Sequence, residues 1–175
     1  MNTRFNSKQR SSRSRYGLGD YLYRRDGDFK CAHCRHYVSA ASILSGVNNR
    51  NHCPYCLWSR HLDLSTAGDR LAACKAPMQP VGLTLKRTRK KYGKVKGGEL
   101  MLIHLCVECG KASINRIAAD DDVETVLGIF EGSFAMDRHT KTRLAGGGIE
   151  ALQAADRDIV QAQLLGHGII LDKDG

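Results

Sequence analysis

The feature that most constrains this chain is its set of seven cysteines, because six of them form three C-x-x-C pairs. No apolar segment of the kind found in a secretory signal follows the N-terminal charges, so we expect the thiols to be in a reducing compartment. In such a compartment, paired thiols are more often metal ligands than disulfides. The pairs are Cys31/Cys34, Cys53/Cys56 and Cys106/Cys109, and the unpaired cysteine is Cys74.

The first two pairs have the spacing of one complete zinc site. Eighteen residues separate Cys34 from Cys53, which is within the range typical of C-x-x-C…C-x-x-C zinc sites. Zinc prefers four tetrahedral ligands, and thiolates are common in structural sites. An iron–sulfur cluster is the main alternative. A thioredoxin-like redox pair is less favoured, because no βαβ pattern surrounds either motif.

The third pair predicts a second zinc site that needs ligands from elsewhere in the chain. Cys74 is the natural third thiolate. The fourth ligand could be a histidine, an aspartate or a water, and we prefer His61 because it lies on the segment leading to Cys74. With water in the fourth position the site would match a catalytic zinc. However, the H-x-E and Pro-Cys-x-x-Cys signature of the zinc deaminases is absent. The other two candidate histidines are His52 and His104.

The charge of the chain favours an anionic partner. The formal net charge is +9 at pH 7, and a surplus of this size is typical of nucleic-acid-binding proteins. The basic residues are concentrated in residues 1 to 30 and 84 to 110, whereas residues 111 to 175 carry more acidic than basic side chains. We therefore expect nucleic acid to contact the N-terminal and middle parts of the chain.

Two basic segments are the main candidates for this contact. Residues 1 to 28 show no helical or strand period and are predicted to be an extended arm. Residues 81 to 105 are predicted to form a β-hairpin, whose tip carries seven Lys or Arg between 86 and 96 and no acid. A solvated loop would normally mix both signs. The candidate contacts are Arg4, Lys8, Arg10, Arg13, Arg15, Arg24, Arg25, Arg50, His52, Arg60, Lys86, Arg87, Arg89, Lys90, Lys91, Lys94 and Lys96.

Two interpretations remain open for the residues around the second C-x-x-C pair. Arg50, Tyr55 and Trp58 could be presented on a rigid surface, where Arg contacts phosphate and a ring stacks on a base. Alternatively, Trp58 belongs to the core and Arg50 pairs with an acid such as Asp63 or Asp69.

The C-terminal third is predicted to be helical. Residues 120 to 134 begin with three Asp, which the helix dipole favours at a helix start. Residues 148 to 168 show a second helical spacing of apolar residues, with Gly166 as a C-terminal stop. Neither helix indicates a cofactor.

The region from about Phe29 to Asp122 resembles the bacterial RNHCP domain family. The motif Arg50-Asn51-His52-Cys53-Pro54 is intact, and the resemblance also rests on "FKCAHC" (29–34), "NRNHCPYCLWSRHLD" (49–63), "AGDRLAACKAPMQPV" (67–81) and "LIHLCVECGKASINRIAADD" (102–121). It implies a small metal-binding domain and little about activity. We thus expect an α+β fold with three parts: a basic extended arm (1–28), an RNHCP-type double zinc-binding domain with a zinc-ribbon or knuckle core and a β-hairpin (29–122), and a helical C-terminal segment (123–175).

These features together predict a zinc-stabilised RNA-binding structural protein. We expect two Zn²⁺ ions, ribosomal RNA as the partner with neighbouring ribosomal proteins beside it, a bacterial cytoplasmic location and no membrane. The Ser- and Arg-rich composition of residues 1 to 19 leaves organellar import open. The alternatives are a zinc enzyme acting on nucleic acid, a transcription-associated zinc ribbon and, third, a redox switch.

Overall fold

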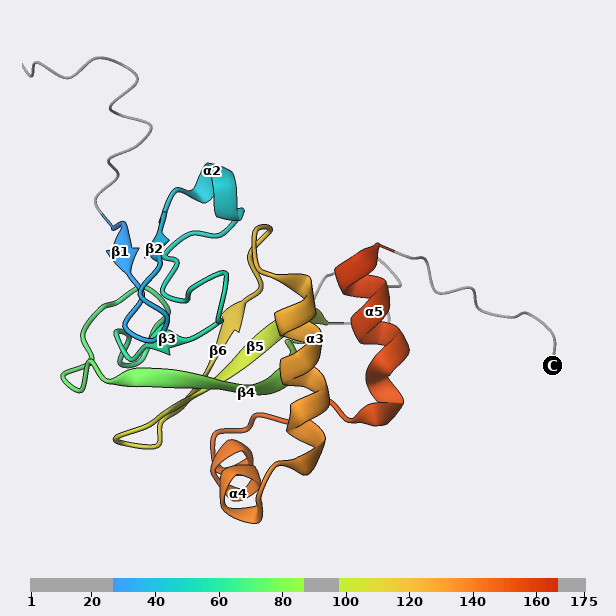
Figure 1. Cartoon of the computed structure of the whole chain (residues 1–175). Coiled ribbons are helices and arrows are strands. Elements are labelled where there is room, and N and C mark those ends of the chain that lie inside the picture. Colours follow the sequence, from blue (N-terminus) through green and yellow to red (C-terminus); the bar gives the residue numbers. More distant parts are fainter. Residues whose placement is uncertain (1–26, 87–97, 167–175) are drawn as a thin grey trace, which may run out of the picture.

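The computed structural model describes residues 27–86 and 98–166 and shows an α+β fold (Figure 1). The strands are β1 (Phe29–Lys30), β2 (Tyr37–Val38), β3 (Ser59–Arg60), β4 (Pro77–Lys86), β5 (Glu99–Cys106) and β6 (Ala112–Arg116). The helices are α2 (Ser42–Ser45), α3 (Val123–Gly132), α4 (Arg138–Gly146) and α5 (Arg157–Leu165), with 3₁₀ turns η1 (Ser133–Ala135) and η2 (Ala154–Asp156).

The strands form two antiparallel sheets. β1 pairs with β2, and a larger sheet has the order β3-β4-β5-β6. Strand β4 pairs with β5 from Met78↔Cys106 to Lys86↔Glu99, so the predicted hairpin strands are confirmed. The predicted basic tip beyond Lys86 and the N-terminal basic arm lie outside the described residues.

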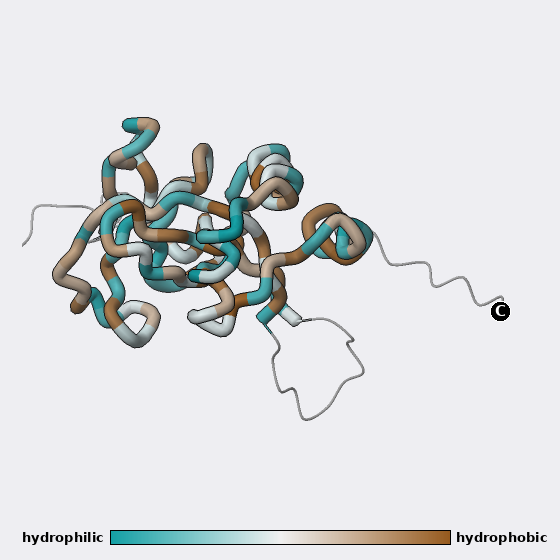
Figure 2. The backbone as a smooth tube through the Cα atoms, turned by 90° about the horizontal axis from the view of Figure 1, so that it is seen from below, coloured by the Kyte–Doolittle hydropathy of each residue, from teal (hydrophilic) through white to brown (hydrophobic). Residues whose placement is uncertain are grey.

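One face of the larger sheet and two helices build the main core. Leu83 on β4 and Leu102 on β5 lie opposite each other and are fully buried. Val126 and Phe130 of α3, together with Val160 of α5, pack in the same cluster. Figure 2 shows hydrophobic and hydrophilic residues alternating along the coiled helical segments, as expected of helices with one buried face.

The C-terminal part is helical, but its helices differ from the predicted ones. Helix α3 forms as expected, with the Asp122 side chain as its N-cap. The predicted helix 148–168 is wrong over its first half, because residues 149 to 153 form neither helix nor strand and the Leu152 N–H donates to the Leu83 carbonyl. Gly166 ends α5 in the left-handed conformation, as predicted. The polar helix α4 was not predicted at all.

Residues 29 to 56 contribute a small separate core. The cluster around β1 and β2 consists of the buried Cys31, Val38 and Cys53, with Phe29 and two further cysteines packed against it. Four of these six residues are cysteines, so this part has little hydrophobic core of its own. Within the described residues, no helix is long and apolar enough to cross a bilayer.

Candidate metal centres

The three C-x-x-C pairs lie on three turns with the same backbone pattern. In each turn the carbonyl of the first cysteine accepts the N–H of the residue four positions later, and its own N–H donates to the carbonyl five positions later, at 2.8–3.1 Å. The residue four positions after the first cysteine has a positive φ in every turn, namely Arg35 (68°), Leu57 (59°) and Gly110 (69°). The main chain therefore places both sulfurs of each pair on the same side of the turn.

The first two turns face each other and bring Cys31, Cys34, Cys53 and Cys56 together, a group we call the first centre. Their sulfurs all lie within 4.8 Å of one another. Cys31 Sγ is 3.6 Å from Cys56 Sγ, and Cys34 Sγ is 3.5 Å from Cys53 Sγ. These distances are too long for disulfides, which need about 2 Å. They are close to the separation of about 3.8 Å expected between thiolates around one tetrahedral ion at 2.3 Å.

The thiols of the first centre differ in their tendency to ionise. Burial raises the pKa of the Cys53 thiol to about 11, and the neighbouring thiols add to this effect. Burial also acts to raise the pKa of Cys34, but hydrogen bonds from the backbone and side chain of His36 lower it to about 6. Four thiolates this close together would repel one another, so a divalent cation is needed to hold all four in the charged form.

The third turn belongs to a second group, His61, Cys74, Cys106 and Cys109, which we call the second centre. Its four ligand atoms also lie within 4.8 Å of one another. Cys74 Sγ is 3.7 Å from Cys106 Sγ, and Cys109 Sγ is 3.3 Å from His61 Nδ1. Of the three candidate histidines, His61 is therefore the one that the fold brings to these thiols. This set also has the composition and size for a single tetrahedral ion.

The two centres differ in exposure. In the first centre two cysteines are buried and two are half-buried, whereas in the second Cys74 and Cys109 are exposed. Helix α4 approaches the third turn at Gly110, where an added methyl group would overlap the guanidinium of Arg143. Arg143 is held in turn by its contact with His139 one helical turn earlier. Because Gly110 has no side chain, there is room for the Arg143 guanidinium beside the second centre.

The arginine and histidine of the R-N-H-C-P motif are buried and hold the start of α3. Arg50 donates to Asp120 at 2.7 Å and to Asp121 at 3.0 Å. His52 Nε2 lies 2.9 Å from Asp121, whose side chain also accepts the Ala118 N–H at 2.8 Å. The Arg50, His52 and Asp121 side chains are at most 2% exposed. We call this network the motif clamp, and it ties the loop before Cys53 to the chain some seventy residues later.

His104 links the second turn to the larger sheet. Its Nε2 lies 2.7 Å from the Leu57 carbonyl, and its Nδ1 lies 2.9 Å from Asn115 Nδ2. Complete burial lowers the pKa of His104 to about 3, with a further contribution from the nearby His52. The ring is therefore neutral at pH 7. It donates from Nε2 to the carbonyl and accepts the Asn115 amide at Nδ1. This contact holds Leu57 in its positive-φ conformation.

The predicted nucleic-acid contacts fall into three groups. Arg50 and His52 do not fit the prediction, because both are buried and paired within the motif clamp. Arg60 and Lys86 are exposed. The remaining residues lie outside the described part of the chain: Arg4, Lys8, Arg10, Arg13, Arg15, Arg24, Arg25, Arg87, Arg89, Lys90, Lys91, Lys94 and Lys96.

The structure also places residues that the sequence analysis did not single out. Arg50 was expected to pair with Asp63 or Asp69 if it was buried, but its partners are Asp120 and Asp121. Asp69 instead stabilises its own loop. Its carboxylate accepts the backbone N–H groups of residues 64 to 66 and of Leu71. The Asp doublet before α3 was a usable signal, because a buried Arg requires a carboxylate.

The comparisons with known proteins identify one family. A model of the RNHCP domain matches residues 26–127, from just before β1 into α3. This is more than half of the 175 residues and includes both centres and the motif clamp. No curated protein and no solved structure matches the chain.

Proposed function

This chain belongs to the RNHCP domain family, and from that premise we propose that it is a zinc-stabilised protein that binds single-stranded RNA. Zinc is the ion we assign to both centres. A set of four thiolates, or three thiolates and one imidazole, is the usual ligand set of a structural zinc. The short sulfur separations suit one ion better than an iron–sulfur cluster, whose several irons and sulfides need more room between the cysteines.

The observation that carries the RNA proposal is the surface of the first centre. Three aromatic rings lie on it beside histidines or lysine: Trp58 stacks on His33 at 4.3 Å, Tyr55 contacts His36, and Lys30 lies over Tyr37. Tyr37 is 80% exposed and Tyr55 56% exposed. We call these three rings the aromatic surface. Exposed rings of this kind are what unpaired bases stack on.

The segment that carries the aromatic surface is positively charged, although Asp28 and Asp122 lie near Tyr37 and Tyr55. Between residues 29 and 62 the chain carries four Lys or Arg and no Asp or Glu. Three of the four, Lys30, Arg35 and Arg60, are exposed. Positive side chains next to stacking rings match the arrangement of a single-strand site, where the rings contact bases and the cations contact phosphates. In the sequence, one of the two basic segments precedes this region and the other follows it.

The proposal predicts binding that weakens with salt and depends on the rings. The full-length protein with both metals bound should bind a single-stranded RNA of about ten nucleotides, measured by fluorescence anisotropy at several salt concentrations. Replacing Tyr37 and Tyr55 with Ala should weaken binding by roughly thirtyfold or more, since stacking contributes about 1–3 kcal/mol per base. Leu71→Ala is a control, because Leu71 is 69% exposed but lies outside the aromatic surface. Equal affinities for all three proteins would contradict the proposal.

The basic tip gives an independent test. Replacing Lys86, Arg87, Arg89, Lys90 and Lys91 with Ala should reduce the slope of log K against log salt. Each phosphate contact that is lost should lower the slope by about 0.7 to 0.9. An unchanged slope would show that this segment does not contact phosphate.

We further propose that the RNA is ribosomal and that the protein is a ribosomal or ribosome-associated protein. Zinc-stabilised small domains with basic extensions suit binding between RNA helices. Sedimentation of ribosomes through sucrose tests this. Retention on one subunit at high salt would indicate an integral component, and loss only at high salt an associated factor. Absence at every salt concentration would contradict the ribosomal assignment and favour a transcription-linked partner.

The enzyme alternative is weaker than the RNA-binding proposal. A catalytic zinc keeps three protein ligands and one position for water. In the second centre, His61 lies with the three thiols and supplies a fourth protein donor. Each centre therefore has a complete set of structural ligands.

A further inference from the structure

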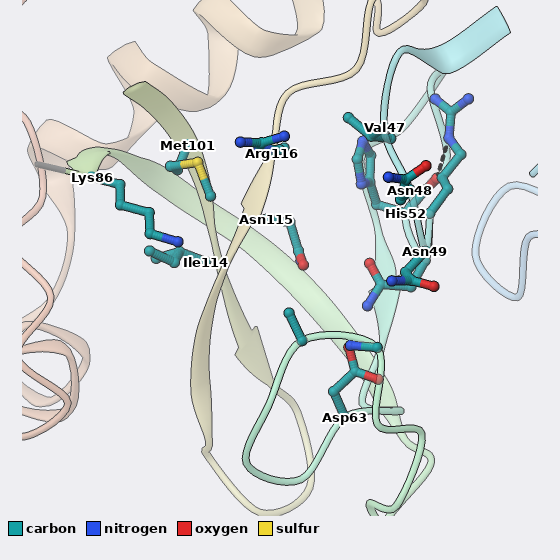
Figure 3. A pocket seen from close by; sticks show the side chains of 14 residues that line it. Val47, Asn48, Asn49, His52, Asp63, Lys86, Met101, Ile114, Asn115 and Arg116 are labelled. Atoms are coloured by element: carbon teal, nitrogen blue, oxygen red, sulfur yellow. Dashed lines mark hydrogen bonds between the residues drawn. The ribbon is translucent and has the colours of Figure 1, made fainter. Parts of the chain in front are cut away.

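A groove crosses the face of β6 next to the motif loop. It consists of two adjoining pockets of about 260 and 390 Å³. They meet where both are lined by Asn51, Asp63, Ile114 and Asn115. Figure 3 shows the first pocket, with strands of the sheet on one side and the loop of Val47 to His52 on the other.

The first pocket has an apolar floor and an amide rim. Val47 and Met101 are buried beneath it, and Ile114 is half-buried. Three amides on the motif loop, Asn48, Asn49 and Asn51, line the rim. The fourth, Asn115, donates to His104 Nδ1, which leaves its Oδ1 as an acceptor, and Figure 3 shows this oxygen pointing into the hollow.

The amides of the motif loop have unused hydrogen-bonding capacity. Within residues 27–86 and 98–166, the side chains of Asn48, Asn49 and Asn51 make no hydrogen bond to protein. Their neighbours Arg50 and His52 are fixed in the motif clamp. The R-N-H motif thus uses alternate residues in two ways, with Arg50 and His52 holding the loop and the asparagines lining the pocket. A loop held in this way loses little entropy when its amides bind a ligand.

Cations lie at both ends of the groove. Lys86 and Arg116 line the first pocket, and Arg60 and Lys111 line the second. Arg116 is paired with Glu99 and Lys111 with the Leu64 carbonyl, whereas no described acid pairs with Lys86 or Arg60. The one acidic lining residue is Asp63, and its carboxylate accepts the N–H groups of Gly68 and Arg70. The groove therefore has positive ends, and its centre is lined by amides together with the Asp63 carboxylate.

We propose that this groove binds a short unpaired segment of an RNA strand and that the first pocket selects among bases. The proposal rests on the RNA-binding function above and adds the site and its selectivity. The apolar floor accepts the face of a base, and asparagine amides pair with base edges that both donate and accept. Lys86 and Arg60 contact the phosphates on either side. Arg60 also lines a small hollow with His33 and Trp58, so the groove leads to the aromatic surface.

The test compares four ten-nucleotide homopolymers of U, A, C and G. The full-length protein with both metals bound should bind them with unequal affinity. The double variant Asn48→Ala/Asn51→Ala should bind its preferred RNA about tenfold more weakly and should lose most of the difference between bases, while the salt slope stays unchanged. Lys86→Ala should weaken all four equally and lower the slope by about 0.7. Asn49 is left unchanged, because its φ of 56° disfavours Ala.

Matched controls separate the outcomes. Gln161→Ala removes an exposed amide from α5, away from the groove, and should change neither affinity nor selectivity. Metal content and Trp58 fluorescence report whether each variant keeps its fold. The groove proposal alone would be overturned if the asparagine variant bound RNA as tightly as the wild type. It would also be overturned if the affinity of this variant fell equally for all four bases. Failure of the wild type to bind any of the RNAs would overturn the RNA-binding function as well.

Discussion

The two candidate metal centres use similar ligands but support the fold in different ways. The first centre draws its four cysteines from a stretch of 26 residues, and these cysteines are most of the local core. The second centre joins the end of β5 to a loop, while the sheet beside it is held by the separate cluster of Leu83, Leu102, Val126 and Phe130. We infer from this comparison that folding depends more on a metal site where the surrounding apolar core is small.

The largest effect should come from breaking the first centre. Cys53→Ser should unfold the region of β1 and β2, because structural zinc contributes on the order of 10 kcal/mol and little apolar core remains without it. The matched variant is Cys74→Ser, which should lose the second metal, expose residues 62 to 76 to protease and leave the sheet folded. Metal analysis and Trp58 fluorescence distinguish the two. A Cys53→Ser protein with full metal content and unchanged fluorescence would contradict the comparison.

Loss of the motif clamp should have the next largest effect. Asp121→Asn leaves the buried Arg50 with only the partly exposed Asp120 as a charged partner, and breaking a buried pair costs about 3–5 kcal/mol. Urea unfolding measures the change in the free energy of unfolding. Glu99→Gln provides the control, because its pair with Arg116 is exposed and should contribute about 1 kcal/mol or less. Equal effects of the two substitutions would show that the clamp is not a major support.

His104 should give the protein a specific pH dependence. The unfolded histidine binds a proton as pH falls below about 6.5, whereas the folded ring stays neutral to about pH 3. Its contribution to stability is therefore present above pH 6.5 and is lost as pH falls, by at most about 1.4 kcal/mol per pH unit. NMR of the metal-bound protein should show the neutral ring at pH 5. His104→Gln, which cannot titrate, should flatten this part of the stability profile, and an unchanged profile would exclude His104 as its cause.

The smallest effect concerns the residue four positions after the first cysteine of each turn. Gly110→Ala should destabilise the second centre by about 1 kcal/mol, because a side chain in the left-handed region is strained and the methyl group displaces Arg143. Arg35→Gly relieves the same backbone strain in the first centre and should not destabilise it. Thermal unfolding measures both. Pairing Gly110→Ala with Arg143→Ala should recover the part due to the collision, and no recovery would show that backbone strain alone is responsible.

Local signals accounted for the parts of the molecule that could be predicted. The spacing of the cysteines grouped six of them correctly, the position of His61 favoured it over two other histidines, and alternating apolar residues gave the hairpin strands. Asp122 and Gly166 marked helix ends because capping depends on residues within one turn. These features need no knowledge of distant contacts.

Features that depend on distant contacts were missed. Arg50 finds its partners seventy residues later, and only the fold brings them together. Residues 149 to 153 have helical spacing but form no helix, and Leu152 bonds to β4 instead, so a tertiary contact outweighs local propensity. Helix α4 buries only Leu144 and therefore carries almost no periodic signal. The amide-lined pocket was missed because asparagines in a loop are normally solvated.

The repeated turn has a consequence for how such a protein could change its partner. Each cysteine pair is positioned by main-chain hydrogen bonds and a positive φ, while the two residues between the cysteines differ completely: Ala32 and His33, Pro54 and Tyr55, Val107 and Glu108. Metal retention and surface chemistry are thus encoded at separate positions. Mutation or engineering could exchange the intervening residues among the turns to alter what the surface binds, while the ligands keep their places.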